Sequence, residues 1–97
     1  MEIRIQAIHF DIAEKLTDFV NRKAEKLTRR YPAVSDIDVN LKLIKPETSL
    51  NKEATLKIHV PQQSDIVATK TADTFEEAVD LCLEAVERQL EKLKSKK

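Results

Sequence analysis

The sequence predicts an α+β domain with the element order β-α-β-β-β-α, a four-stranded sheet that carries two parallel helices on one face. Two observations support this fold class: apolar residues alternate with polar ones in four short segments, and they recur at helical spacing in two longer ones. The 97 residues, 41% of them apolar, suffice for one hydrophobic core but not two. We therefore expect one domain over residues 1–97, with an ordered core over about 1–93 and a Lys-rich tail over 94–97.

The chain is expected to begin with a strand and a long helix. Residues 2–8 alternate apolar and polar side chains, which predicts the strand. From Asp11 the apolar period becomes helical, and Asp11 with Glu14 resembles a capping box. We expect the helix over about 12–30, ending before Pro32, because proline disfavours helical geometry in the residue that precedes it.

Three further strands and a second helix are expected to follow. Alternation is clearest over 37–43, and it returns over 53–60 after a polar connection that contains Pro46. A weaker run over 65–71 predicts a fourth strand at an edge of the sheet. The helical period over 75–95, preceded by a second possible capping box, predicts the last helix.

This order of elements places the ends of the two helices together. A helix that connects two neighbouring strands makes them parallel, and the two later hairpins reverse the chain twice more. The helices should therefore run in the same direction, with their C-terminal halves at one end of the domain. The apolar faces predict a core that includes Ile3, Ile5, Leu16, Phe19, Val20, Leu27, Val39, Leu41, Leu56, Ile58, Phe75, Val79, Cys82 and Val86.

Charge is sorted along the chain although its formal net charge is zero. Residues 22–30 carry five cations and one anion, residues 88–97 carry five and one, and residues 73–87 carry six carboxylates and no cation. The helix macrodipole favours acidic starts and basic ends, which explains part of this sorting. It does not require five cations at each end, so a positive local field suited to a polyanion such as folded RNA is the functional interpretation.

Other kinds of site find little support in the sequence. The chain has no glycine, which removes every Gly-rich phosphate loop, and His9 and His59 have no second ligand at metal-binding spacing. The single cysteine, Cys82, excludes an internal disulfide and is expected to be a small buried side chain. We expect no catalytic residue, metal or cofactor, no small-molecule substrate, no membrane segment and a cytoplasmic location.

Seven segments together resemble one known family in their order and spacing. The last of them, residues 87–94, is similar to an Asp-Arg-Gln-Leu-x-Lys-x-Lys ending. The segments are Ile3-Arg4-Ile5, His9-Phe10, Leu16 to Leu27, Val39-Asn40-Leu41, Glu53 to Pro61, Asp73 to Asp80, and Glu87 to Lys94. On these residues the chain resembles the ribosome hibernation-promoting factor and ribosome-associated inhibitor family, and its short members in particular.

The resemblance implies a fold similar to double-stranded-RNA-binding domains and a role as a ribosome hibernation factor. Such a factor occupies the decoding region of the small ribosomal subunit, binds 16S rRNA, occludes mRNA and tRNA, and inhibits translation in stationary phase or starvation. We expect a non-enzymatic protein that is monomeric away from the ribosome. Ala85 and Glu91 stand where basic residues are common in the family.

The expected RNA-binding residues come from two sources. The resemblance implies Lys23, Lys26, Arg88, Lys92 and Lys94. The charge pattern adds three arginines from the end of the first helix, namely Arg22, Arg29 and Arg30. Two alternatives remain open: a general double-stranded-RNA-binding module, and a protein-interaction domain that uses the exposed face of the sheet.

Overall fold

The computed structural model describes residues 2–44 and 50–95, with side chains as far as residue 93. The predicted connection around Pro46 and the last two residues of the predicted tail lie outside the described residues. The observed element order is the expected one. The elements are β1 (Glu2–Ile8), α1 (Glu14–Arg30), β2 (Asp36–Leu43), β3 (Lys52–His59), β4 (Ile66–Ala72) and α2 (Phe75–Ser95).

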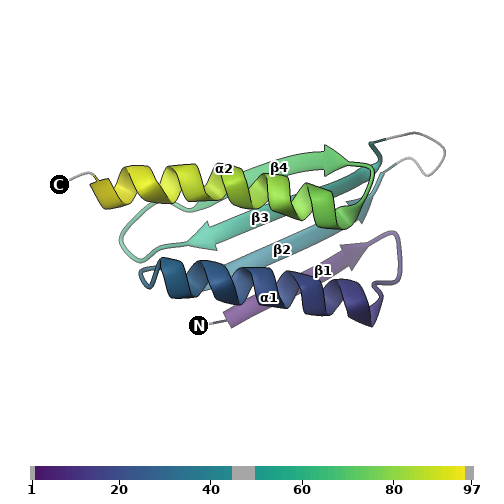
Figure 1. Ribbon diagram of the computed structural model, residues 1–97, viewed down its shortest axis with the longest axis horizontal. Helices are drawn as coiled ribbons and strands as arrows, with labels where there is room; N and C mark the ends of the chain where they lie inside the picture. Colours follow the sequence, from purple (N-terminus) through teal and green to yellow (C-terminus); the bar gives the residue numbers. More distant parts are fainter. Residues whose placement is uncertain (1, 45–49, 96–97) are drawn as a thin grey trace.

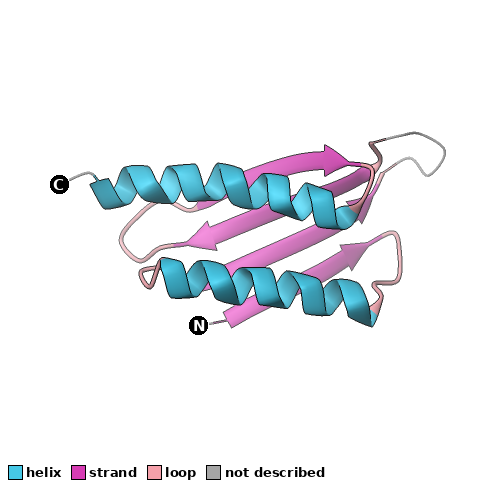
Figure 2. Cartoon of the chain, viewed as in Figure 1, coloured by secondary structure: helices cyan, strands magenta, loops and turns pink. Residues whose placement is uncertain are grey.

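The four strands form one sheet in the order β1-β2-β3-β4. β1 pairs with β2 in parallel because α1 carries the chain back between them, whereas the β2–β3 and β3–β4 pairs are antiparallel. The prediction that the fourth strand lies at an edge is thus confirmed. Both helices cover the same face of the sheet, which leaves a two-layer domain (Figure 2).

The two helices run in the same direction, so their C-terminal ends lie at the same end of the molecule (Figure 1). This arrangement follows from the alternating direction of the elements and agrees with the expectation from the sequence. The last turn of α1 carries Arg29 and Arg30, and α2 carries Arg88 and Lys92 in its C-terminal half. The topology therefore brings together two basic segments that are far apart in the sequence.

The hydrophobic core lies between the helices and the inner face of the sheet. It includes Leu41 and Ile58 on the central strands and Val79 and Val86 on α2, each no more than 1% exposed. Eleven of the fourteen predicted core residues are buried; the other three, Ile3, Ile5 and Phe19, are only partly buried and pack against the core. Ile3 and Ile5 lie on an edge strand, and Phe19 lies on the flank of α1 with Lys23 Nζ 5.3 Å from its ring centre.

The two helices begin in different ways. Thr74 caps α2, since its Oγ1 accepts a hydrogen bond from the Glu77 amide at 3.1 Å, which agrees with the sequence prediction. The capping box expected at Asp11 is wrong, because α1 begins only at Glu14 and its N-cap residue is Ala13, which has no capping side chain. The Ala13 carbonyl accepts the first helical hydrogen bonds there, from the amides of residues 16 and 17.

Two further findings limit the kinds of site to consider. No described helix is both long enough and apolar enough to cross a membrane. Among the described residues, no group of three or more His, Cys, Asp or Glu side chains could hold a metal ion. The Cys82 thiol is buried, and burial raises its pKa, so the thiol is held in its neutral form.

Candidate nucleic-acid interface

Three of the cations of α1 face solvent. Arg22, Lys26 and Arg29 are exposed, because the opposite side of the helix buries Leu16, Val20, Ala24 and Leu27. The Arg22 side chain lies along the helix, with its Nε donating to the Asp18 carbonyl at 3.4 Å. These three cations are free to meet a large polyanion approaching the helical face.

A groove separates the two helices and mixes both signs of charge. It has a volume of about 630 Å³, and leucine side chains from both helices contribute to its lining. α1 contributes the cations Lys23, Lys26 and Arg30, whereas α2 contributes four carboxylates. These carboxylates belong to Glu77, Asp80, Glu84 and Glu87.

Two ion pairs cross this groove. Lys23 Nζ lies 3.1 Å from Asp80 Oδ1, and Arg30 Nη1 lies 3.5 Å from Glu87 Oε2. All four side chains are more than one third exposed, and exposed pairs of this kind contribute only about 0–1 kcal/mol each. Because these pairs are weak and exposed, a phosphate group can replace the carboxylate partner of either cation.

A second hollow, nearer the C-terminal ends, collects cations from both helices. Arg30, Arg88 and Lys92 line it together, around a volume of about 760 Å³. Its lining also includes three carboxylates, those of Glu84, Glu87 and Glu91. The structure thus brings one predicted residue of α1 together with two of α2; Arg22 and Arg29 do not line this hollow, and the Lys94 side chain lies outside the described part of the chain.

Tyr31 joins the two helices at this end. The residue is only 5% exposed, so its ring packs in the core rather than offering a face for base stacking. Its hydroxyl donates a hydrogen bond to Glu91 Oε2, and this bond, followed by burial, raises the pKa of Tyr31. No local sequence pattern predicts this contact, because Glu91 lies 60 residues from Tyr31.

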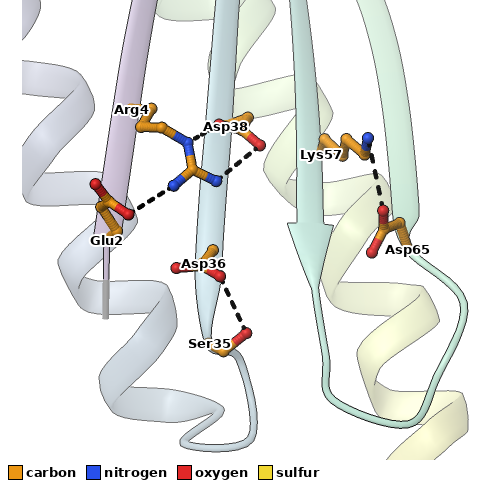
Figure 3. Close-up of polar contacts among 7 residues, drawn as sticks. All are labelled: Glu2, Arg4, Ser35, Asp36, Asp38, Lys57 and Asp65. Carbon is orange, nitrogen blue, oxygen red and sulfur yellow. Dashed lines mark hydrogen bonds and ion pairs between the residues drawn. The ribbon is translucent and has the colours of Figure 1, made fainter.

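The opposite face of the sheet is polar, and several of its charges are paired with one another. Arg4 lies between two carboxylates, with Nη1 donating to Glu2 at 2.8 Å and Nη2 donating to Asp38 at 3.1 Å (Figure 3). The hydrogen bond from Arg4 holds the pKa of Asp38 below its ordinary value. Lys57 pairs with Asp65 at 3.6 Å on the same face, nearer the β4 edge of the sheet (Figure 3).

These features define a small α+β domain with cationic helix ends above one face of a mixed sheet. The family model described as "Sigma 54 modulation protein / S30EA ribosomal protein" matches residues 3–97. The chain belongs to this family, and the match covers almost the whole length of the chain.

Curated relatives and solved structures agree with that family. A protein of Azotobacter vinelandii named "Ribosome hibernation promoting factor" is 27% identical over 96 residues, covering 99% of this chain and 85% of the relative. A protein of the same name from Pseudomonas putida KT2440 is 26% identical, with 99% and 89% covered.

Two solved structures share the fold. A "ribosomal subunit interface protein" from Coxiella burnetii superimposes with a TM-score of 0.85 at 26% identity, covering 99% of this chain and 100% of that one. The N-terminal domain of Thermus thermophilus Protein Y superimposes with a TM-score of 0.77 at 18% identity, covering 96% and 99%. The second likeness, at its low identity, concerns the fold alone.

Proposed function

We propose that this protein is a ribosome hibernation factor, which binds the small ribosomal subunit and silences it by occupying the decoding region. Relatives that match almost the whole chain bear the name of such a factor, and one solved relative is titled a ribosomal subunit interface protein. The protein acts by binding in the cytoplasm and needs no catalytic residue or cofactor. Its partner is 16S rRNA, and mRNA and tRNA are excluded while it is bound.

The binding surface is the helical face, and its cations act in three ways. Arg22, Lys26 and Arg29 are exposed and meet rRNA phosphates directly. Lys23 and Arg30 exchange their carboxylate partners for phosphates, since both ion pairs are solvent-exposed. Arg88, Lys92 and Lys94 extend the contact along α2. Phosphate contacts supply most of the affinity, and the fit to folded rRNA supplies most of the specificity.

The single observation that carries this proposal is the hollow shared by Arg30, Arg88 and Lys92. Three cations from two distant segments converge there, whereas the macrodipole alone favours cations at each helix end separately. A flexible or single-stranded polyanion can adapt to any spacing between the cations of the two helices. A folded RNA has phosphates at fixed positions and requires cations at a matching fixed spacing. The fixed spacing of these three cations therefore favours rRNA as the partner.

Co-sedimentation with purified small subunits, in competition with initiator tRNA and mRNA, tests this function. We expect binding to fall as either competitor is added, because all three ligands use the same region. Binding that is indifferent to both competitors would overturn the decoding-region proposal. A general double-stranded-RNA-binding module would instead bind an isolated RNA duplex about as well as it binds the subunit.

The alternative that uses the sheet face has weaker support. Its charged residues Arg4, Asp38, Lys57 and Asp65 already pair with one another across the strands. These pairs balance the charge on the sheet face, whereas α1 exposes the three cations Arg22, Lys26 and Arg29 together. The helical face is therefore the surface assigned to the ribosome.

A further inference from the structure

A third hollow opens at the end of the domain where both helices finish, and it differs from the charged grooves in its chemistry. Its volume is about 330 Å³, at the lower end of the range of about 300–1,000 Å³ that is usual for small-ligand pockets. Three segments meet there: the turn after α1, the turn after β3 and the last turns of α2. Its apolar walls include Tyr31, Pro32, Val60, Leu90 and Leu93.

Three of the residues that line this hollow carry polar side-chain groups, and one of them, the Tyr31 hydroxyl, already donates to Glu91. The other two are Arg30 and Gln63. Arg30 brings an exposed guanidinium, whose carbon atom lies 5.6 Å from the centre of the Tyr31 ring. Gln63 brings an exposed carboxamide, which can both donate and accept hydrogen bonds. The backbone amide of Gln63 donates to the Val60 carbonyl at 3.1 Å, which fixes the turn that holds it. An apolar cavity with two polar groups suits a flat ring system that has a polar edge.

Charge continuity indicates which ligand carries such a ring. Arg30 lines both this hollow and the one that it shares with Arg88 and Lys92, where three cations and three carboxylates meet. A ligand that binds these three cations and also enters the apolar hollow carries anionic groups beside an apolar one. An RNA strand with one unpaired nucleotide has this pattern, because its phosphates are charged and its unstacked base is flat.

We propose that this hollow, which we name the base pocket, receives one unpaired nucleobase of the bound RNA. Arg30 holds the phosphate of that nucleotide, the side chains of Pro32 and Leu93 flank the ring, and the Gln63 carboxamide hydrogen-bonds with its polar edge. The inference rests on the proposed function and deepens it. It explains how a domain that binds phosphates on a helical face distinguishes folded rRNA from a regular duplex.

Fluorescence anisotropy with two RNA hairpins tests the base pocket. The hairpins have the same sequence, except that one contains a single bulged nucleotide in its stem. We expect the wild-type protein to bind the bulged hairpin about tenfold more tightly, because the pocket buries the apolar faces of one unpaired base that the plain stem does not offer. Equal affinities would overturn the proposal.

Two variants locate the preference in the pocket. Ala33 is exposed and lines it, so Ala33→Trp fills the space from its rim. Ala13→Trp is the matched control, because Ala13 is also exposed but precedes α1 at the far end of the domain. We expect Ala33→Trp to lose the preference and keep its affinity for the plain hairpin, whereas Ala13→Trp behaves as wild type. If Ala33→Trp fails to fold, Leu93→Glu, which places a carboxylate in the pocket, should also lose the preference, with weaker binding of both hairpins because the carboxylate repels phosphate.

The remaining outcomes separate this inference from the proposed function. A pocket variant that folds and keeps the tenfold preference would overturn the base pocket. If Ala33→Trp loses small-subunit binding while the wild type shows no preference for the bulge, the pocket receives a protein side chain and the proposal is wrong. If the wild type fails to bind small subunits at all, the ribosomal function fails, whatever the hairpins show.

Discussion

The hydroxyl of Tyr31, the residue that follows α1, donates a hydrogen bond to the carboxylate of Glu91 in the C-terminal half of α2. This bond ties together the ends of two helices whose cations form the candidate interface. Glu91 stands at a position where the family resemblance leads one to expect a basic residue. Its role here is to accept the Tyr31 bond, which fixes the distance between the basic end of α1 and the cations Arg88 and Lys92 of α2.

Replacing Tyr31 by Phe should lower the free energy of unfolding by about 1 kcal/mol, the usual loss for one hydrogen bond. The ring remains in place, so the change isolates the hydroxyl. Urea denaturation of both proteins at pH 7 measures the difference. A loss above about 3 kcal/mol would mean that the ring packing had changed as well.

The same pair gives a pH dependence with a defined sign. The pKa of Tyr31 is higher in the folded protein than its unfolded value of about 10, so the bond stabilises the protein fully below about pH 10. This contribution is lost as the pH rises through the folded pKa. The difference in stability between wild type and Tyr31→Phe should therefore be constant from pH 6 to 9 and shrink above pH 10.

Phe75 and Phe19 should differ in their contribution to stability. Phe75 is 8% exposed and stacks on Phe10 with ring centres 4.5 Å apart, so Phe75→Ala should cost about 3–5 kcal/mol. Phe19 is only partly buried, and its truncation should cost about half as much. Denaturation midpoints of the two variants provide the measurement, and equal losses would contradict the assigned helical faces.

The sequence was sufficient to predict the fold because each element carries a strong local pattern. The alternation in β2 and β3 and the helical period of α2 located those elements to within a residue or two. The predicted start of α1 was wrong. The spacing of Asp11 and Glu14 matches a capping box, but the helix begins only at Glu14, after the N-cap residue Ala13. The helical period also predicted too much burial for Phe19. How far a side chain at the border of the apolar face is buried depends on the elements packed beside the helix, which the local sequence does not show.

The candidate site was predictable only in part. The cations and their common end of the domain followed from charge and topology. The acidic lining of the interhelical groove could not be predicted from the sequence. Helical spacing shows which residues of α2 share one side of the helix, but not which side faces α1. In the sequence, Glu84 and Glu87 are only two of the six carboxylates over residues 73–87. The structure shows that both line the groove between α1 and α2, and that Glu87 pairs with Arg30.

Neutralising one groove carboxylate should therefore strengthen RNA binding. Glu84 lines both charged hollows, so Glu84→Gln removes a repulsion toward phosphate and should raise affinity for small subunits about threefold, within the range of exposed charge effects. Glu76→Gln is the matched control, because Glu76 is exposed near the start of α2 and lines neither hollow. Filter binding at fixed salt gives both affinities, and an equal gain in the two variants would indicate a net-charge effect only.

Acid should remove the stability that the Arg4–Asp38 pair contributes on the outer face of the sheet. The bond from Arg4 lowers the pKa of Asp38, so its contribution to stability is present above the unfolded pKa of about 3.9 and is lost as pH falls through the lower folded value. Denaturation midpoints between pH 2 and 6 should fall less steeply in Asp38→Asn than in wild type. Identical pH profiles would show that the Arg4–Asp38 pair contributes nothing measurable.

Charge reversals on the two faces of the domain locate the ribosome-binding surface. Arg88→Glu and Lys57→Glu change the net charge equally, but Arg88 lies on α2 and Lys57 on the outer face of the sheet. Both side chains are exposed, so neither change should unfold the domain.

Only Arg88→Glu should weaken binding to small subunits, because the helical face meets the phosphates. It should also flatten the dependence of log affinity on log salt by about one unit, the effect of losing one phosphate contact. Lys26→Glu should behave like Arg88→Glu if α1 and α2 dock together. Full binding by both helix variants, with loss in Lys57→Glu, would transfer the interface to the opposite face and favour the protein-interaction alternative.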